Sequence, residues 1–237
     1  MEYKYCKNDN FEDYASGRVL YSAEGVPNFP VRLINEIFGY ALEYSSKKQN
    51  LCVYDPCCGG GYSLTVLGYW HQDVIEKLYG SDIDTKIMKT AKKNLSLLGS
   101  DGLDKRYAEL KSLYESYGKE SHREAIMSLE RLRSKLTANI SRELFVADCT
   151  RELPHISPDI IITDIPYGNL VDWNSDSENP LRDMLQQLAA ISHRDTVLAV
   201  SMDKKQSIEH PAWLRKKKQS IGKRKFEIYL HNHNFSY

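Results

Sequence analysis

The sequence lacks any long apolar run. None of its 237 residues belongs to a stretch that approaches the roughly 18 apolar residues of a membrane-spanning helix. The first residues, MEYKYCKNDNFEDYASG, also lack the basic and apolar segments of a secretory leader. A membrane protein and a secreted protein are both disfavoured, and we expect a cytoplasmic location.

The cysteines show no spacing that is typical of a disulfide framework or a zinc site. The cysteines are odd in number and form no C-x-x-C pair: Cys6, Cys52, Cys57, Cys58 and Cys149. Neither a disulfide framework nor a zinc site is indicated, and we expect no metal. The histidines, including the HNH at 231–233, are dispersed and are expected to be structural.

Short apolar runs alternate with helical patterns along the chain. The runs lie at 51–55, 78–83, 143–148, 159–164, 196–201 and 226–232, and the helical patterns at 30–45, 62–75, 84–98 and 180–192. This alternation predicts an α/β fold with a mostly parallel sheet covered on both faces. The length and the 41% hydrophobic fraction suit one globular domain over residues 1–237.

Two charged segments depart from the alternation. Residues 99–142 are charged, favour helix and are broken at Gly118, so they predict an inserted helical hairpin, either a solvated elaboration or a surface for a large partner. The stretch 204–225 holds many cations against the single acid Glu209, which suits a solvated face or a phosphate backbone. On the second reading the expected phosphate contacts are Lys216, Lys217, Lys218, Lys223 and Arg224.

The stretch DPCCGGGYSL places three glycines between a strand and a helix. A Walker A loop is excluded, because it needs a Gly-Lys-Ser/Thr end and no lysine occurs before Lys77. A nicotinamide or flavin fingerprint is weakened, because Leu64 stands where its third glycine would be. Asp55, at the strand end, would repel a pyrophosphate and attract an ammonium group. S-adenosylmethionine carries an ammonium group and a sulfonium cation and no phosphate, so it suits this turn.

Two further acids end the next strands. Asp82 can accept both ribose hydroxyls, and Asp148 can accept from an adenine amino group. One acid after a strand is more often a cap or turn residue than a ligand. Three such acids on consecutive strand ends, beside a glycine turn, favour an S-adenosylmethionine site.

The segment ITDIPYGNL follows the fourth predicted strand. Its Asp-x-Pro-Tyr resembles the Asp/Asn-Pro-Pro-Tyr motif of amino-methyltransferases, with Ile165 in place of the first proline. Asp164 can hold a planar nitrogen by its hydrogens while Tyr167 stacks on the ring that bears it, and Pro166 stiffens the loop. We therefore expect Asp164, Pro166 and Tyr167 to be catalytic.

Four segments together resemble one known family. They are FPVRLINEIF, DPCCGGGYSLTVLG, SDIDTKIMKTAKKNLSLL and TDIPYG, with the helical insertion after the third. From about Val19 to Leu170 the chain resembles the AviRa family of ribosomal RNA methyltransferases, associated with resistance to avilamycin. The resemblance implies a Rossmann-like class I methyltransferase fold and S-adenosylmethionine as methyl donor. It also implies a guanine of large-subunit (23S) ribosomal RNA as acceptor.

The resemblance also implies roles for parts of the chain. An N-terminal segment, 1–45, is expected to cover the cofactor. The expected cofactor contacts are Phe29, Asp55, Cys57, Gly59, Gly61, Asp82 and Asp148.

Two questions about the acceptor stay open. An exocyclic amine is favoured over a ring nitrogen such as guanine N1, for which Asp164 would have to act as the base. Transfer RNA, DNA adenine or a protein could also be the substrate. The chain could instead be an inactive RNA-binding or assembly module, against which the intact Asp164, Pro166 and Tyr167 argue.

Overall fold

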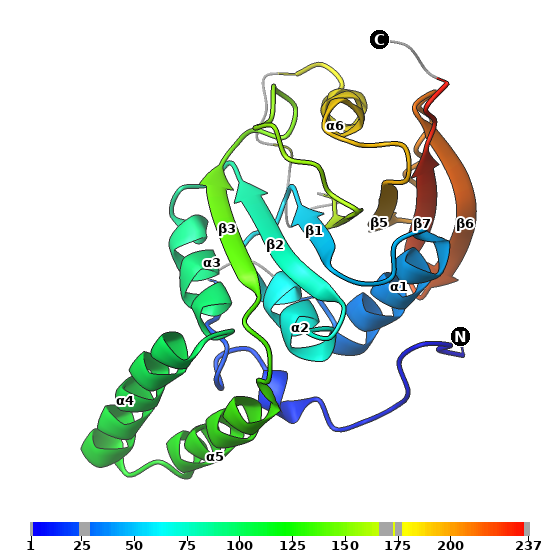
Figure 1. Cartoon of the computed structure of the whole chain (residues 1–237). Coiled ribbons are helices and arrows are strands. Elements are labelled where there is room, and N and C mark those ends of the chain that lie inside the picture. The colour runs from blue at the N-terminus through cyan, green and yellow to red at the C-terminus, as the bar shows by residue number, and fades with distance from the viewer. Residues whose placement is uncertain (1, 24–28, 166–172, 174–176, 235–237) are drawn as a thin grey trace.

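A mostly parallel sheet forms the centre of the protein (Figure 1). The computed structural model describes residues 2–23, 29–165, 173 and 177–234. Within them the strands are β1 (Leu51–Asp55), β2 (Ile75–Asp82), β3 (Ser141–Val146), β4 (Ile160–Asp164), β5 (Val197–Asp203), β6 (Trp213–Ile221) and β7 (Arg224–His231). Their order is β3-β2-β1-β4-β5-β7-β6, and β7 runs in the direction opposite to the other six.

The order of the strands reverses beside β1. From β1 the chain proceeds to β2 and β3 on one side, and then returns to place β4 and β5 on the other. In an open α/β sheet the ligand crevice lies at the carboxyl ends of the strands at such a reversal. The ends of β1, β2 and β4 are therefore where a site is expected.

Helices cover both faces of the sheet, as the alternation predicted. The helices of the described residues are η1 (Glu12–Tyr14), α1 (Val31–Tyr44), α2 (Tyr62–Trp70), α3 (Ile87–Ser96), α4 (Ser100–Tyr117), α5 (Glu120–Lys135) and α6 (Pro180–Ala190). One apolar cluster joins α1, α2 and α3 to sheet residues such as Val53 and Ile162, and a second joins α6 to Tyr54 and Leu198 on the opposite face. None of these helices is long and apolar enough to cross a membrane.

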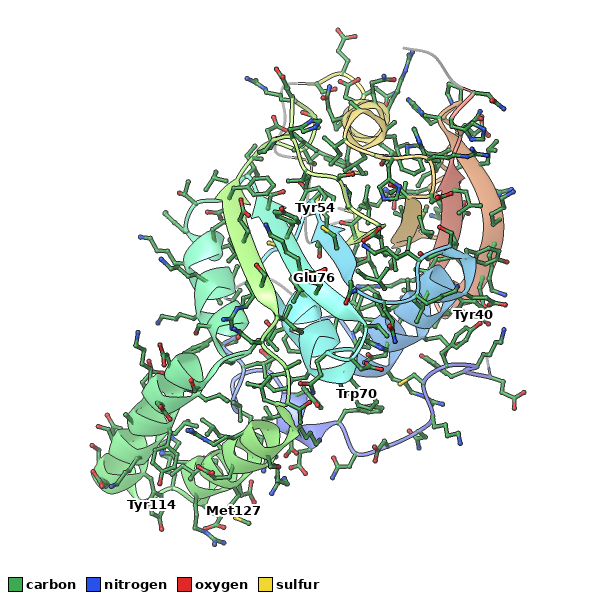
Figure 2. The ribbon with its side chains drawn as sticks, viewed as in Figure 1. Tyr40, Tyr54, Trp70, Glu76, Tyr114 and Met127 are labelled. Carbon is green, nitrogen blue, oxygen red and sulfur yellow. The ribbon has the colours of Figure 1, made fainter. Side chains whose placement is uncertain are left out.

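The segment 99–142, for which an inserted helical hairpin was predicted, holds α4 and α5, which extend away from the sheet (Figure 1). Gly118 joins them with a φ of +61°, a left-handed conformation that glycine adopts without strain. Tyr114 and Met127 lie on the outer part of the hairpin and are 36% and 48% exposed, whereas Tyr54 lies at the sheet and is buried (Figure 2).

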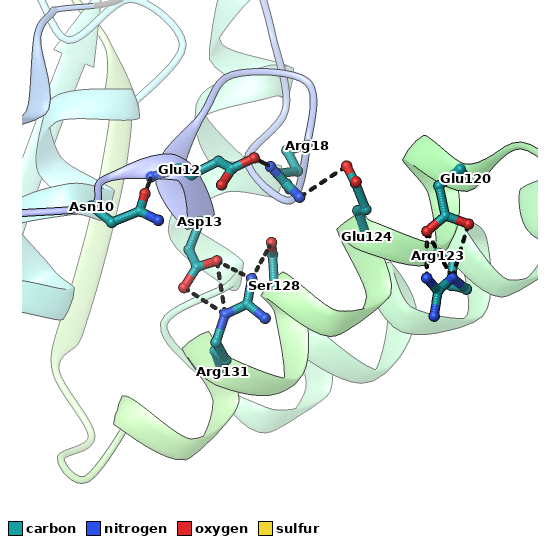
Figure 3. Close-up of polar contacts among 9 residues, drawn as sticks. All are labelled: Asn10, Glu12, Asp13, Arg18, Glu120, Arg123, Glu124, Ser128 and Arg131. Carbon is teal, nitrogen blue, oxygen red and sulfur yellow. Dashed lines mark hydrogen bonds and ion pairs between the residues drawn. The ribbon is translucent and has the colours of Figure 1, made fainter.

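The N-terminal segment packs against the base of the hairpin (Figure 3). The guanidinium of Arg131 on α5 donates to Asp13 at 2.6 Å. Arg106 on α4 donates from Nε to the carbonyl of Val19 at 2.9 Å. Residues 2–23 thus hold the hairpin to the sheet domain, while a cofactor-covering role for segment 1–45 stays a prediction.

Strand β6 was not predicted. Its sequence, WLRKKKQSI, has no apolar alternation, because β6 is the edge strand and pairs only with β7. Lysines on an edge strand discourage pairing with another chain, which gives this basic stretch a structural role. Two of the five expected phosphate contacts are also engaged within the protein. The Lys217 ammonium lies 4.2 Å from the centre of the Tyr40 ring, and Arg224 donates to Asp164.

Candidate active site

Three of the predicted acids lie on one face of the sheet. Successive side chains of a strand point to opposite faces, so residues two or four apart share a face. Asp55 follows Val53 by two residues, Asp82 follows Leu78 by four, and Asp164 follows Ile162 by two. Val53, Leu78 and Ile162 all belong to the apolar cluster under α1 and α2. The three carboxylates therefore continue that face just beyond the core, at the ends of β1, β2 and β4.

The glycine turn after β1 brings backbone close to these acids. Gly59 has a φ of +51°, and its N–H donates to Oδ2 of Asp82 at 2.9 Å. Gly61 begins α2 with a φ of +71°. A Cβ added there would lie 2.7 Å from Leu95 Cδ1 and 3.0 Å from Ala91 Cα, so only glycine allows this approach of the turn to α3.

Asp82 is held in a fixed orientation by the backbone. Its Oδ2 accepts from Gly59, and its Oδ1 accepts from the N–H of Asp84 at 3.0 Å. Burial raises the pKa of this carboxyl above its usual value. Each carboxylate oxygen retains a further lone pair, which suits a pair of ribose hydroxyls as donors.

Asp55 is a buried acid without a cation beside it. The residue is 5% exposed, and its Oδ1 accepts from the N–H of Cys57 at 3.1 Å. Burial, with a smaller contribution from the charges of Asp82 and Asp164, raises its pKa to about 7. No ion pair reaches Asp55 within the described part of the chain. A ligand with an ammonium group and a sulfonium cation would supply the missing positive charge, so these residues fit S-adenosylmethionine.

Cys57 and Phe29 lie differently from the other expected cofactor contacts. The Cys57 thiol is 3.6 Å from that of Cys149 and packs with the cluster on the α6 side, so its backbone N–H is the part that faces Asp55. Phe29 is 7% exposed and belongs to the core under α1. For both residues, contact with the cofactor stays a prediction. The described residues contain no group of three potential metal ligands.

The Asp148 carboxylate contacts residues of the turn that follows it. Its Oδ1 accepts from the N–H and the hydroxyl of Thr150 at 2.9 and 2.7 Å, and Nε of Arg151 lies 3.3 Å from Oδ2. Asp148 and Arg151 also line a cavity of about 690 Å³ between the end of β3 and the end of α6. The adenine contact assigned to Asp148 stays a prediction.

Asp164 ends β4 with one oxygen engaged and one available. Nη1 of Arg224 donates to Oδ2 at 3.2 Å, whereas Oδ1 is buried without a hydrogen-bond partner among the residues described. Burial raises the pKa of Asp164 to about 6, against the opposing effect of Arg224. Ile165 is buried, and its N–H donates to the carbonyl of Ser201 at 3.1 Å. Pro166 and Tyr167 lie outside the described residues.

The sequence did not predict that Arg224 belongs to this site. Arg224 stands in a run of cations that favoured a solvated or phosphate-binding face. Its position at the start of β7, beside β5, depends on a strand pairing that no local pattern indicates.

Comparison with known proteins places this geometry in a family. The family model described as rRNA methyltransferase AviRa matches residues 1–224. A 23S rRNA (guanine(2535)-N(1))-methyltransferase of Streptomyces viridochromogenes is 38% identical over 199 residues, which are 80% of each chain.

Solved structures agree with the sequence comparison. A 1.5 Å structure of rRNA methyltransferase AviRa from Streptomyces viridochromogenes is 33% identical, has a TM-score of 0.86 and covers 94% of each chain. TrmN from Thermus thermophilus, 13% identical with a TM-score of 0.52 over 86% of this chain and 49% of that one, shares the fold. The chain belongs to the rRNA methyltransferase AviRa family, with the class I methyltransferase fold and S-adenosylmethionine as its methyl donor.

Proposed function

We propose that this enzyme methylates N1 of a guanine in 23S ribosomal RNA. The activity named for the 38% identical relative supports this acceptor. The observation that carries the proposal is Oδ1 of Asp164 at the end of β4, which is buried, has no hydrogen-bond partner among the described residues and lies beside two further acids. A hydrogen-bond acceptor in that state favours a substrate that brings an N–H group.

Guanine N1 requires a base, because the ring nitrogen carries a proton that must leave. Asp164 would accept this proton at Oδ1 as the bond from N1 to the methyl carbon forms and the bond from sulfur to that carbon breaks. With its pKa raised to about 6, Asp164 would be ionised at neutral pH. It would also be a stronger base than a carboxylate of ordinary pKa, which favours proton removal from N1. The named relative thus favours the ring nitrogen over the exocyclic amine that the motif favoured.

The residues around the crevice would hold the donor. Asp82 would accept from the ribose hydroxyls, Asp55 would pair with the ammonium group, and the turn at Gly59 and Gly61 would let the backbone approach the methionine end. Asp148 would face the adenine. When bound, S-adenosylmethionine supplies a methyl group activated by its sulfonium charge.

Tyr167 and Pro166 keep their predicted roles at the target base. Exposed cations, among them Lys216, Lys218 and Lys223, would contact phosphates. Ribosomal RNA as substrate makes a cytoplasmic location part of the proposal. A link to avilamycin resistance stays a prediction from the family resemblance.

The decisive experiment is methyl transfer to 23S ribosomal RNA, with the product nucleoside identified by mass spectrometry. We expect 1-methylguanosine, and a reverse-transcription stop at the modified position. A matched RNA with inosine at that position lacks the exocyclic amine and should still be methylated at N1. N2-methylguanosine, or methylation of transfer RNA in place of ribosomal RNA, would contradict the proposal.

A further inference from the structure

Arg224 contacts both the Asp164 carboxylate and the Phe29 ring of the core. It is the first residue of β7 and pairs with Asp203 of β5. It precedes Phe226 by two residues, so its side chain lies on the same face as the three acids. Nη1 donates to Oδ2 of Asp164 at 3.2 Å, and the guanidinium carbon is 5.4 Å from the centre of the Phe29 ring.

This arrangement gives the two carboxylate oxygens of Asp164 different surroundings. The Phe29 ring is fixed in the core, and an arginine over an aromatic face is restricted in its orientation. Of the two carboxylate oxygens the guanidinium contacts Oδ2, and Oδ1 is left without a hydrogen-bond partner among the residues described. We propose that Arg224 is a positioning residue that holds the Asp164 carboxylate ionised and turned so that Oδ1 faces the substrate nitrogen.

The charges around Asp164 agree with this role. From β1, Asp55 faces Asp164 and disfavours its ionisation, and Asp82 of β2 lies beyond Asp55. From β5 the neighbour is Ser201, whose hydroxyl carries no charge and lowers the pKa of Asp164 by hydrogen bonding. From β7 Arg224 supplies the positive charge, and burial acts against it by raising the pKa of Asp164 to about 6. Loss of Arg224 would leave Asp164 among acids only, with a pKa higher still.

The same geometry argues against the phosphate contact that was expected of Arg224. Among the neighbouring cations, Lys223 is exposed, whereas the Arg224 side chain is 29% exposed and turned inward to Asp164. Arg224 and Lys223 carry the same charge on adjacent positions of the chain. They therefore form a matched pair for separating a positioning role from a general attraction for RNA.

The inference rests on the proposed function, and its test is the pH dependence of kcat/KM for methyl transfer to 23S ribosomal RNA. Activity should rise as Asp164 ionises. In Arg224→Gln the midpoint of this rise should move up by about one pH unit or more, with roughly tenfold lower kcat/KM at pH 6 and a much smaller loss at pH 9. Arg224→Lys should restore much of the midpoint. Lys223→Gln should leave the midpoint unchanged, whatever its effect on RNA affinity.

A second readout needs no activity. Carbon-13 NMR of labelled aspartate carboxyls, with the Asp164 signal assigned from Asp164→Asn, should show the same upward shift of its titration in Arg224→Gln. An unshifted titration, or a variant that only raises KM and flattens its salt dependence, would overturn the positioning role in favour of phosphate binding. Failure of the wild-type chain to methylate 23S RNA would instead refute the proposed function and leave the NMR result to decide on Arg224.

Discussion

The helical hairpin and the crevice use their charges in opposite ways. Around the hairpin, acids and bases of the N-terminal segment, α4 and α5 form ion pairs, and Figure 3 shows those between the N-terminal segment and α5. The pairs are Asp13 with Arg131, Glu124 with Arg18, Asp104 with Arg133, and Glu109 with Arg106. At the crevice, Asp55 has no ion pair within the described ranges, and one oxygen of Asp164 has no partner there.

The difference separates ion pairs that support the fold from the acids for which we propose a role in chemistry. Partly exposed pairs each contribute about 0–1 kcal/mol to stability, because water already solvates the separated ions. A buried acid without a cation beside it costs free energy, and Asp55 is such an acid at the point where the strand order reverses. The crevice should therefore respond to substitution through activity and binding, and the hairpin through stability.

The largest effect is expected at Asp164. An asparagine in its place keeps a hydrogen-bond acceptor and cannot take up a full proton, so Asp164→Asn should lower single-turnover methyl transfer about 10²- to 10⁴-fold. Cofactor affinity, measured by calorimetric titration, should stay within a few-fold. Appreciable transfer by this variant would show that Asp164 only positions its substrate, as an exocyclic amine would require.

The next effect is loss of cofactor binding in Asp82→Ala. Two ribose hydroxyls would each lose a charged acceptor worth about 1.5–3 kcal/mol, which predicts at least a 100-fold weaker affinity by calorimetry. Asp84→Ala is the matched control. Asp84 accepts from the N–H groups of Lys86 and Ile87 at the start of α3, so its loss should lower stability and spare affinity. Equal loss of affinity in both variants would remove Asp82 from the ribose site.

Asp55→Asn should stabilise the cofactor-free protein while weakening cofactor binding. The folded pKa of Asp55, about 7, lies above the unfolded value near 3.8, so the folded state binds the proton more tightly. Stability is therefore lost as pH rises between about 4 and 7. Asparagine avoids this loss, and we expect a gain on the order of 2 kcal/mol at pH 8 by urea unfolding, fading towards pH 4. A loss of stability at pH 8 would contradict the unpaired-acid account.

The sequence predicted the parts of the site that depend on local pattern. Strand β1 occupies the predicted residues 51–55, because an apolar run ends there at an acid and a glycine turn. The hydrogen bond from the N–H of Thr150 to Asp148 was not predicted, although it is local, because an acid at a strand end suits a turn as well as a ligand. The pair between Asp164 and Arg224 could not be predicted, because it joins residues 60 positions apart through strands whose order no local signal determines.

The smallest effect is expected from the pair between Asp13 and Arg131, in which the side chains are 12% and 48% exposed. A double-mutant cycle with Asp13→Asn and Arg131→Gln should give a coupling energy of about 0.5–1 kcal/mol at pH 7 and no change in the pH profile of methyl transfer. Although burial opposes it, Arg131 holds the pKa of Asp13 below its usual value. This stability is therefore present above the unfolded pKa and should be lost as pH falls through the folded one. A coupling energy well above this range would show that the pair contributes more than a partly exposed ion pair does. An altered pH profile of methyl transfer would show that the contact between the N-terminal segment and the hairpin affects the crevice, so that the two regions are energetically coupled.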